Sequence, residues 1–145
     1  MVKSYPHVPG IDFSGTVESS NVSNYSKGDK VILTGWRVGE VVWGGYAQKA
    51  RVQASQLVPL PNGLSTKEAM AMGTAGFSAM LAIITLEEHG LTKDKGEVLV
   101  TGATGGVGSV SILLLSNSGY KVVAVSGKKS SIDYLKDIGA SRVID

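Results

Sequence analysis

The sequence predicts an α/β chain in which a small all-β unit precedes the first half of a doubly wound parallel sheet. Short β-like runs, broken by glycine, proline, asparagine and aspartate, fill residues 1–64. A helical pattern follows over residues 65–92, and the order strand, glycine turn, helix, strand, helix, strand occupies residues 93–145. Strands that alternate with helices in this way are typical of a parallel sheet. We therefore divide the chain at these two boundaries.

In the β unit, short apolar runs between turn signals predict four strands. Gly28-Asp29 and Gly44-Gly45 are typical turn pairs that separate some of these runs. The predicted strands are Ile11–Ser19, Lys30–Thr34, Tyr46–Val52 and Gln56–Val58.

Two connecting helices are predicted next. Ser65-Thr-Lys-Glu68 has the spacing of a capping box, in which the serine and glutamate side chains bond the backbone N–H groups of each other's residues. Thr74 is a candidate cap for a second helix, and Gly90 is placed to end it.

A glycine-rich turn then separates an apolar strand from an apolar helix. Ala103, Gly105 and Gly108 in this turn form the pattern A-x-G-x-x-G. The helix N-terminus presents unpaired N–H groups and partial positive charge to phosphates. Gly105 allows the backbone to approach a pyrophosphate, and Gly108 allows the helix to pack closely on the strand. The pattern alone also fits an ordinary turn, but its context favours a pyrophosphate site made of Thr104, Gly105, Gly106 and Val107.

The remaining elements complete one and a half βαβ units. We expect a helix over Val107–Ser118, a strand over Lys121–Val125, a helix over Ser131–Ile138 and a strand that begins at Arg142. The chain stops within this last strand, whereas a doubly wound sheet needs more strands. The expectation is a truncated chain that is catalytically inactive and poorly stable by itself.

The loop after Val125 predicts the choice of dinucleotide. An NAD site carries an acidic residue about twenty positions beyond the glycine loop, where it bonds the ribose 2′-hydroxyl. Here the chain reads Ser126-Gly127-Lys128, which offers a hydroxyl and a cation and no carboxylate. These three residues predict an NADPH site that holds the 2′-phosphate. The alternative is a solvated loop with surface lysines.

Composition narrows the class of protein further. The 145 residues are 43% hydrophobic, contain no cysteine and carry a formal net charge of +2. Disulfides and thiolate metal sites are thereby excluded, and nothing resembles a basic nucleic-acid surface. The N-terminal residues lack the apolar region of a secretory signal, and the apolar stretch over residues 75–86 is too short to span a bilayer. We expect a cytoplasmic protein with a small-molecule substrate and no nucleic-acid or membrane partner.

Several motifs together resemble the medium-chain dehydrogenase/reductase superfamily. They occur in the superfamily's order across almost the whole chain, and some are similar to the YhdH/YhfP type of quinone oxidoreductase, which includes acryloyl-CoA reductase. The resemblance implies a partial GroES-like β domain, the first half of a Rossmann domain and a homodimeric full-length parent. The motifs are Pro9-Gly-Ile-Asp12-x-x-Gly15, Gly28-Asp-Lys-Val31, Thr34-Gly-Trp-x-x-Gly39-Glu40, Gly44-Gly-Tyr-Ala47, Gly73-Thr-Ala-Gly76, Thr101–Gly108 and Val123-Ala-Val-Ser-Gly127.

The resemblance also implies an activity. It points to a zinc-independent reductase that transfers hydride from NADPH to an activated alkene, such as an α,β-unsaturated carbonyl compound or an acryloyl-CoA-like thioester, or to a quinone. Ile11 stands where zinc-dependent members have a histidine ligand, so no metal site is expected, and Asp12 is expected to have a structural hydrogen-bonding role. Thr74 is expected near the nicotinamide. Trp36 and Trp43 are expected either to wall the substrate pocket or to be core aromatics.

No catalytic acid or base is assigned, and two alternatives stay open. The glycine loop also fits Thr-Gly-x-x-x-Gly-x-Gly of short-chain dehydrogenases. None of the five tyrosines has the lysine four positions on that those enzymes use, however. The second alternative is an inactive nucleotide-binding fragment or a crystallin-like relative without enzymatic activity.

Overall fold

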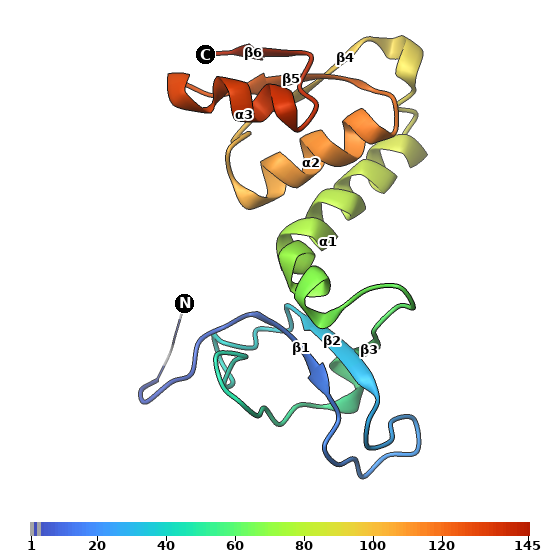
Figure 1. Ribbon diagram of the computed structural model, residues 1–145, viewed down its shortest axis with the longest axis vertical. Helices are drawn as coiled ribbons and strands as arrows, with labels where there is room; N and C mark the ends of the chain where they lie inside the picture. Colours follow the sequence, from blue (N-terminus) through green and yellow to red (C-terminus); the bar gives the residue numbers. More distant parts are fainter. Residues whose placement is uncertain (1, 3) are drawn as a thin grey trace. The chain divides into compact units, whose positions relative to one another are not determined.

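The computed structural model describes Val2 and residues 4–145, and the chain divides into two compact units. One unit ends at Thr74 and the other runs from Ala75 to Asp145. The division falls inside the segment expected to carry the connecting helices. Figure 1 follows the chain through both units, which are described separately below.

The first unit is built on an antiparallel sheet in the order β1-β2-β3. Its strands are β1 (Asp12–Thr16), β2 (Lys30–Thr34) and β3 (Val58–Pro59). Alternate residues of β2 point to opposite faces of the sheet, as the period of a strand requires. Val31 and Leu33 are 5% and 0% exposed, so one face of β2 supplies the core of this unit.

The strand expected over Tyr46–Val52 is wrong. The chain turns irregularly there, because only its beginning finds a backbone partner. Tyr46 N–H donates to the Pro9 carbonyl at 3.0 Å, whereas Ala47 N–H donates back to the Gly45 carbonyl at 2.8 Å. Tyr46 is largely exposed, and the residues that follow it meet no neighbouring strand. An apolar-polar pattern without a pairing partner does not make a strand.

The last predicted strand of this unit is displaced along the chain. A 3₁₀ turn occupies Ala54–Gln56, and β3 begins only at Val58. Val58 pairs with Ile32 of β2, so the strand starts where the register of β2 offers a partner.

Helix α1 (Thr66–Glu88) contains a break at Gly73. The predicted capping box is confirmed: Ser65 N–H donates to the Glu68 carboxylate at 2.8 Å, and Glu68 N–H donates to Ser65 Oγ at 3.2 Å. Gly73 has φ 48° and ψ −153°, so the helix interrupts and restarts there. By length and composition α1 qualifies as a candidate membrane span. The part beyond the break, residues 74–88, is about 22 Å long, which is shorter than a bilayer core.

The second unit contains a parallel sheet in the order β4-β5-β6. Its strands are β4 (Glu97–Val100), β5 (Lys121–Val125) and β6 (Arg142–Ile144). Helices α2 (Gly106–Asn117) and α3 (Ile132–Asp137) connect them, within one or two residues of the predicted bounds. The fold class is therefore confirmed: an antiparallel β unit is followed by the strand and helix order of one half of a doubly wound sheet.

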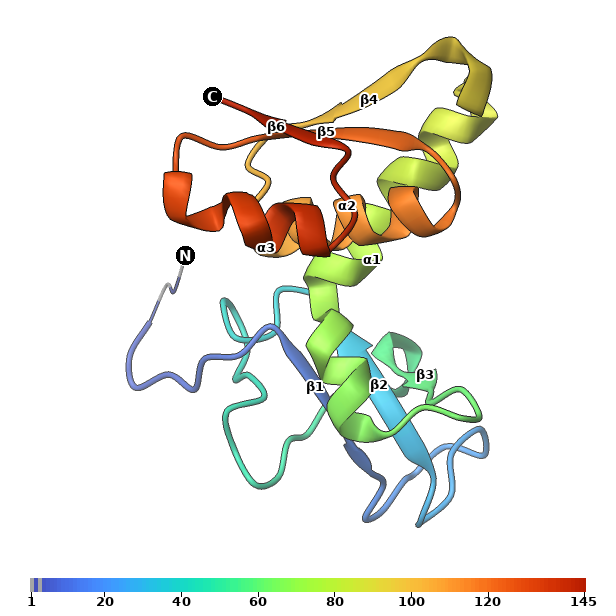
Figure 2. The same ribbon diagram turned by 45° about the horizontal axis from the view of Figure 1, so that its top comes forward.

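The core of the second unit lies on one face of this sheet. Figure 2 shows α2 and α3 along that face. Ile112 of α2, Leu135 of α3 and Val122 of β5 are 0% exposed and form the centre of the apolar cluster. On the opposite face Leu99 of β4 is 57% exposed. This second face, called the open face below, is therefore not fully covered, whereas parallel sheets usually have both faces covered.

An ion pair crosses the open face of the sheet. Arg142 of β6 donates to both carboxylate oxygens of Glu97 of β4, at 3.2 and 2.7 Å, and β5 lies between these strands. The bond from Arg142 lowers the pKa of the Glu97 carboxyl below its usual value. Because both groups are half-exposed, the pair contributes little to stability.

Candidate nucleotide-binding site

The two segments predicted to bind the dinucleotide lie at the same edge of the parallel sheet. Val100 at the end of β4 pairs with Ala124 of β5. Because the strands are parallel, the glycine loop after β4 and the loop after β5 both leave the sheet at its carboxyl edge. This edge is where open α/β sheets bind their ligands. Two loops that are separated in the sequence by a helix and a strand thus leave the sheet at the same edge.

The glycine loop is closed by its own backbone and opens toward solvent. Gly102 has φ +59°, and Gly105 N–H donates to the Gly102 carbonyl at 2.9 Å. Gly105 is the N-cap of α2, and no side chain caps this helix end. The first N–H groups of a helix have no partner within the helix. All four predicted pyrophosphate residues are exposed, namely Thr104, Gly105, Gly106 and Val107.

Gly108 is required for the packing of the loop. A Cβ atom at this position would run into the Gly102 carbonyl oxygen and lie 2.9 Å from the Ala103 Cα. Gly108 thus permits a close approach, but its neighbour is the loop after β4, and the predicted packing against the strand itself is wrong. At Gly105 a Cβ atom would meet only the Gly102 carbonyl oxygen, at 3.2 Å. A side chain at Gly105 would therefore press on this carbonyl, but less severely than one at Gly108.

Helix α1 supports the start of α2. A Cβ atom on Gly106 would lie 3.2 Å from the Cβ of Ala75. A larger residue at position 106 would push the two helices apart. Gly105 and Gly106 therefore have different neighbours, the Gly102 carbonyl for Gly105 and α1 for Gly106.

The loop after β5 presents one hydroxyl and one cation. Ser126 N–H donates to the Ile144 carbonyl of β6 at 2.9 Å, which continues the ladder beyond the strand end. Lys128 N–H donates to Ser126 Oγ at 3.2 Å. Ser126 Oγ is thus an acceptor within the loop, and its own proton stays available for a ligand. Gly127 and Lys128 are exposed.

The structure also brings a carboxylate to this loop, which the sequence reasoning missed. A Cβ atom on Gly127 would lie 2.9 Å from the Asp145 Oδ1. The sequence reasoning considered only the residues directly after Val125, whereas Asp145 follows the neighbouring strand. The predicted order of parallel strands could have indicated this carboxylate, because residues that follow two paired parallel strands lie side by side. Val125 pairs with Ile144, so their successors are neighbours.

In the β unit, Asp12 and Thr74 form a hydrogen-bonded pair. Thr74 N–H donates to Asp12 Oδ2 at 2.9 Å, and the Thr74 hydroxyl donates to Asp12 Oδ1 at 2.5 Å. The helix that restarts after Gly73 is therefore capped by Asp12, and the expected capping by the Thr74 side chain is wrong. The structural hydrogen-bonding role expected for Asp12 is confirmed.

The tryptophans are not core residues. Trp36 and Trp43 are 62% and 64% exposed, so the core alternative for them is wrong. Trp36 lies in the turn after β2 and has φ 54°, a left-handed backbone conformation that is uncommon for a residue other than glycine.

Residues with the chemistry of metal ligands are scattered. Among the residues that the structure describes, no group of three or more His, Cys, Asp or Glu side chains is placed to hold a metal ion. Ile11 occupies the position next to Asp12, and Asp12 is engaged with Thr74. His89 Nδ1 lies 2.8 Å from the Thr85 carbonyl oxygen at the end of α1.

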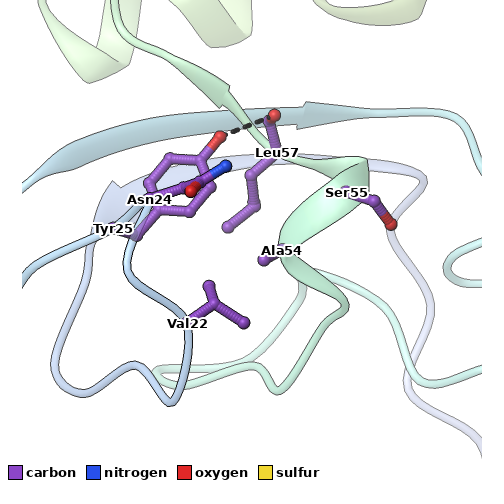
Figure 3. Close-up of a pocket in the computed structure, with 6 residues that line it drawn as sticks. All are labelled: Val22, Asn24, Tyr25, Ala54, Ser55 and Leu57. Carbon is purple, nitrogen blue, oxygen red and sulfur yellow. Dashed lines mark hydrogen bonds between the residues drawn. The ribbon is translucent and has the colours of Figure 1, made fainter.

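A shallow pocket of about 470 Å³ lies within the β unit (Figure 3). The Tyr25 hydroxyl at its wall donates to the Leu57 carbonyl at 2.8 Å, so the phenol is already satisfied. The pocket offers no cation for a phosphate. Its lining residues are Val22, Asn24, Tyr25, Ala54, Ser55 and Leu57.

Comparison with known proteins agrees with this geometry. Residues 1–62 match the alcohol dehydrogenase GroES-like domain. The chain is 61% identical over 144 residues to acrylyl-CoA reductase AcuI of Ruegeria pomeroyi, covering 99% of this chain and 44% of that protein. The predicted family resemblance is confirmed.

Solved structures extend the comparison to the backbone. The Salmonella enterica yhdH oxidoreductase in complex with NADP superposes with a TM-score of 0.97 at 52% identity. The Bacillus subtilis protein yhfP with NAD bound gives 0.95 at 51% identity. Both matches cover 99% of this chain and 44% of the other. The chain thus spans less than half the length of these relatives.

Proposed function

We propose that this chain carries the first part of the dinucleotide site of a zinc-independent, NADPH-dependent reductase. The proposed reaction is the reduction of an activated alkene, either an α,β-unsaturated carbonyl compound or an acryloyl-CoA-like thioester, or of a quinone. The observation that carries this proposal is the carboxyl edge of the parallel sheet. There the uncapped N-terminus of α2 follows β4, and the Ser126–Lys128 loop follows the neighbouring strand β5. Similarity to acrylyl-CoA reductase over 99% of the chain supports the substrate class.

The residues at this edge fit a dinucleotide with a 2′-phosphate. The N–H groups at the start of α2 and the dipole of the helix suit a pyrophosphate. Thr104, Gly105, Gly106 and Val107 surround that position and are exposed. A side chain at Gly105 would fill the space that the phosphates need.

The second loop suits the adenosine end of NADPH. Ser126 has a hydroxyl proton to donate, Gly127 leaves its backbone open, and Lys128 supplies a cation. Such charge-assisted bonds to phosphate are stronger than neutral ones. Lysine lacks the bidentate fork of arginine, so the selectivity for phosphate at Lys128 rests on charge.

When bound, NADPH supplies the hydride, and the protein supplies binding and orientation. The chain's own residues hold the pyrophosphate at one loop and the 2′-phosphate at the other. These two contacts fix the orientation of the nucleotide along the sheet edge. No residue of this chain is assigned as a proton donor.

The experiment uses the whole protein that carries these residues. We expect steady-state reduction of an enone or enoyl thioester, with a higher kcat/KM for NADPH than for NADH. Lys128→Ala is expected to weaken NADPH binding by roughly 1–3 kcal/mol and to leave NADH binding nearly unchanged. Lys93→Ala, which also removes an exposed lysine, is the control. Failure to reduce any of these substrates would refute the proposed reaction.

Zinc independence is tested in the same preparation. We expect elemental analysis to find no stoichiometric zinc and chelators to leave the rate unchanged, because Ile11 cannot bind a metal and these 145 residues contain no cysteine. Activity that is lost to a chelator and restored by zinc would contradict this part of the proposal.

A further inference from the structure

The Asp145 carboxylate next to Gly127 has no role in the function proposed so far. It lies on β6's carboxyl side, one residue beyond Ile144, and Ile144 pairs with Val125. A Cβ atom on Gly127 would come within 2.9 Å of Asp145 Oδ1. Glycine at position 127 therefore leaves room for this carboxylate against the backbone of the loop. The loop proposed for the 2′-phosphate thus has an anion beside it as well as its own cation.

The carboxylate is free to bind a ligand. Within the part of the chain that the structure describes, Asp145 forms no hydrogen bond and no ion pair, and it is exposed. Lys128 is likewise exposed and pairs with no described carboxylate. Since the two charges are not joined to each other, each can act on a bound nucleotide.

The two charges favour opposite forms of the dinucleotide. A 2′-phosphate is attracted by Lys128 and the Ser126 hydroxyl, and it is repelled by a carboxylate nearby. A ribose 2′-hydroxyl is a donor, for which a carboxylate is a strong acceptor. An acidic residue that bonds this hydroxyl is the usual determinant of NAD binding, where it follows the second strand. Here the carboxylate comes from the third strand, β6, and reaches the same loop from the side.

We propose, building on the function above, that Asp145 is a specificity residue whose carboxylate accepts the ribose 2′-hydroxyl of NADH, so that the site takes both dinucleotides. Lys128 and Ser126 favour NADPH, and Asp145 opposes them. The preference for NADPH is therefore moderate and is set by the balance of two side chains from neighbouring strands.

The test compares the affinities of ligands that differ only in the 2′-phosphate. Dissociation constants of 2′,5′-ADP and 5′-AMP are determined by calorimetry on the whole protein that carries this chain, together with those of NADPH and NADH. The variant is Asp145→Asn, which keeps the size of the side chain and removes its charge. The control is Asp137→Asn at the far end of α3, an exposed position with the same change in charge.

For Asp145→Asn we expect the affinity ratio of NADPH to NADH to rise roughly tenfold or more, since a bond to a charged acceptor is lost and a like charge is removed. The ratio of 2′,5′-ADP to 5′-AMP should rise in parallel. Asp137→Asn should leave both ratios unchanged. Unchanged ratios in Asp145→Asn would overturn the inference, whatever the enzyme reduces.

A second variant guards against a folding defect. Gly127→Ala places a methyl group where Asp145 Oδ1 now lies, so the carboxylate must move. We expect a shift of the ratio in the same direction, with an unfolding midpoint close to that of the parent protein. Because binding is measured directly, loss of the proposed reductase activity and failure of this inference are separate outcomes. A ratio that falls in Gly127→Ala would also overturn it.

Discussion

The joint of Asp12, Gly73 and Thr74 allows a quantitative test of how the break in α1 is held. Asp12 accepts two hydrogen bonds from Thr74, one from the backbone N–H at 2.9 Å and one from the hydroxyl at 2.5 Å. Gly73 has φ 48° and ψ −153°, and a Cβ atom there would lie 2.7 Å from Asp12 Oδ2. The carboxylate and the glycine are therefore expected to be energetically coupled.

The magnitudes follow from these contacts. Bonds to a charged acceptor contribute about 1.5–3 kcal/mol each, and both are half-buried, so Asp12→Ala should cost about 2–4 kcal/mol. Thr74→Val removes only the hydroxyl bond and should cost about 1–2 kcal/mol. Gly73→Ala combines backbone strain of about 1–3 kcal/mol with a clash against Asp12. In the Asp12→Ala background the clash is gone and only the strain remains.

The double-mutant cycle of Asp12→Ala and Gly73→Ala is the assay. We expect the double variant to be more stable than the sum of the two single variants predicts, by about 1–2 kcal/mol. Stability is measured by urea unfolding with circular dichroism. Hydrogen exchange of the Thr74 amide provides a local measurement, and it should accelerate in Asp12→Ala.

Glu18→Ala is the matched control for this cycle. Glu18 is also a carboxylate of the β unit, but its ion pair with Lys49 at 2.7 Å is exposed. Its loss should change stability by less than about 0.5 kcal/mol. Additive effects of Asp12→Ala and Gly73→Ala, or unchanged exchange at Thr74, would refute the reasoning that the carboxylate holds the break.

Three further predictions concern the second unit. Gly108→Ala should destabilise this unit by about 1–3 kcal/mol, because its Cβ would meet the backbone of Gly102. Gly105→Ala should fold and lose cofactor affinity. Thermal unfolding measures the first effect, and titration with NADPH measures the second. The Tyr120 hydroxyl donates to Glu87 at 2.8 Å, which raises the pKa of Tyr120 above 10.0, so its stabilisation is present below pH 10.0 and is lost as the pH rises through the folded-state value. Tyr120→Phe should therefore be less stable than the parent at neutral pH, and a constant difference through the alkaline range would contradict this. Leu99→Gln should reduce the self-association measured by sedimentation, because Leu99 is 57% exposed on the open sheet face.

The local elements of the parallel-sheet unit were predictable because each carries its own signal. Strand β5 has the predicted bounds, and α2 and α3 differ from expectation by one residue at each end. An apolar run, a glycine turn and an apolar helix are properties of neighbouring residues. Likewise, the Ser65 capping box involves groups three residues apart.

The errors arose where a partner distant in sequence decides the outcome. Tyr46–Val52 has a strand-like composition, but a strand exists only where another strand offers a ladder. Thr74 has the residue type of a helix cap, but the carboxylate of Asp12, 62 residues away, accepts its N–H. Neither outcome is encoded in the local pattern.

The sequence by itself determined the fold class, the order of the elements and the residue types at the two loops of the candidate site. Only the tertiary structure decided which groups meet at the carboxyl edge. The pairing of β5 with β6 brings Asp145 beside Gly127, and thereby adds an anion to a loop that the linear sequence shows only as hydroxyl and cation. The physical reason is that charges act through space, and parallel strand pairing sets that distance independently of the separation along the chain.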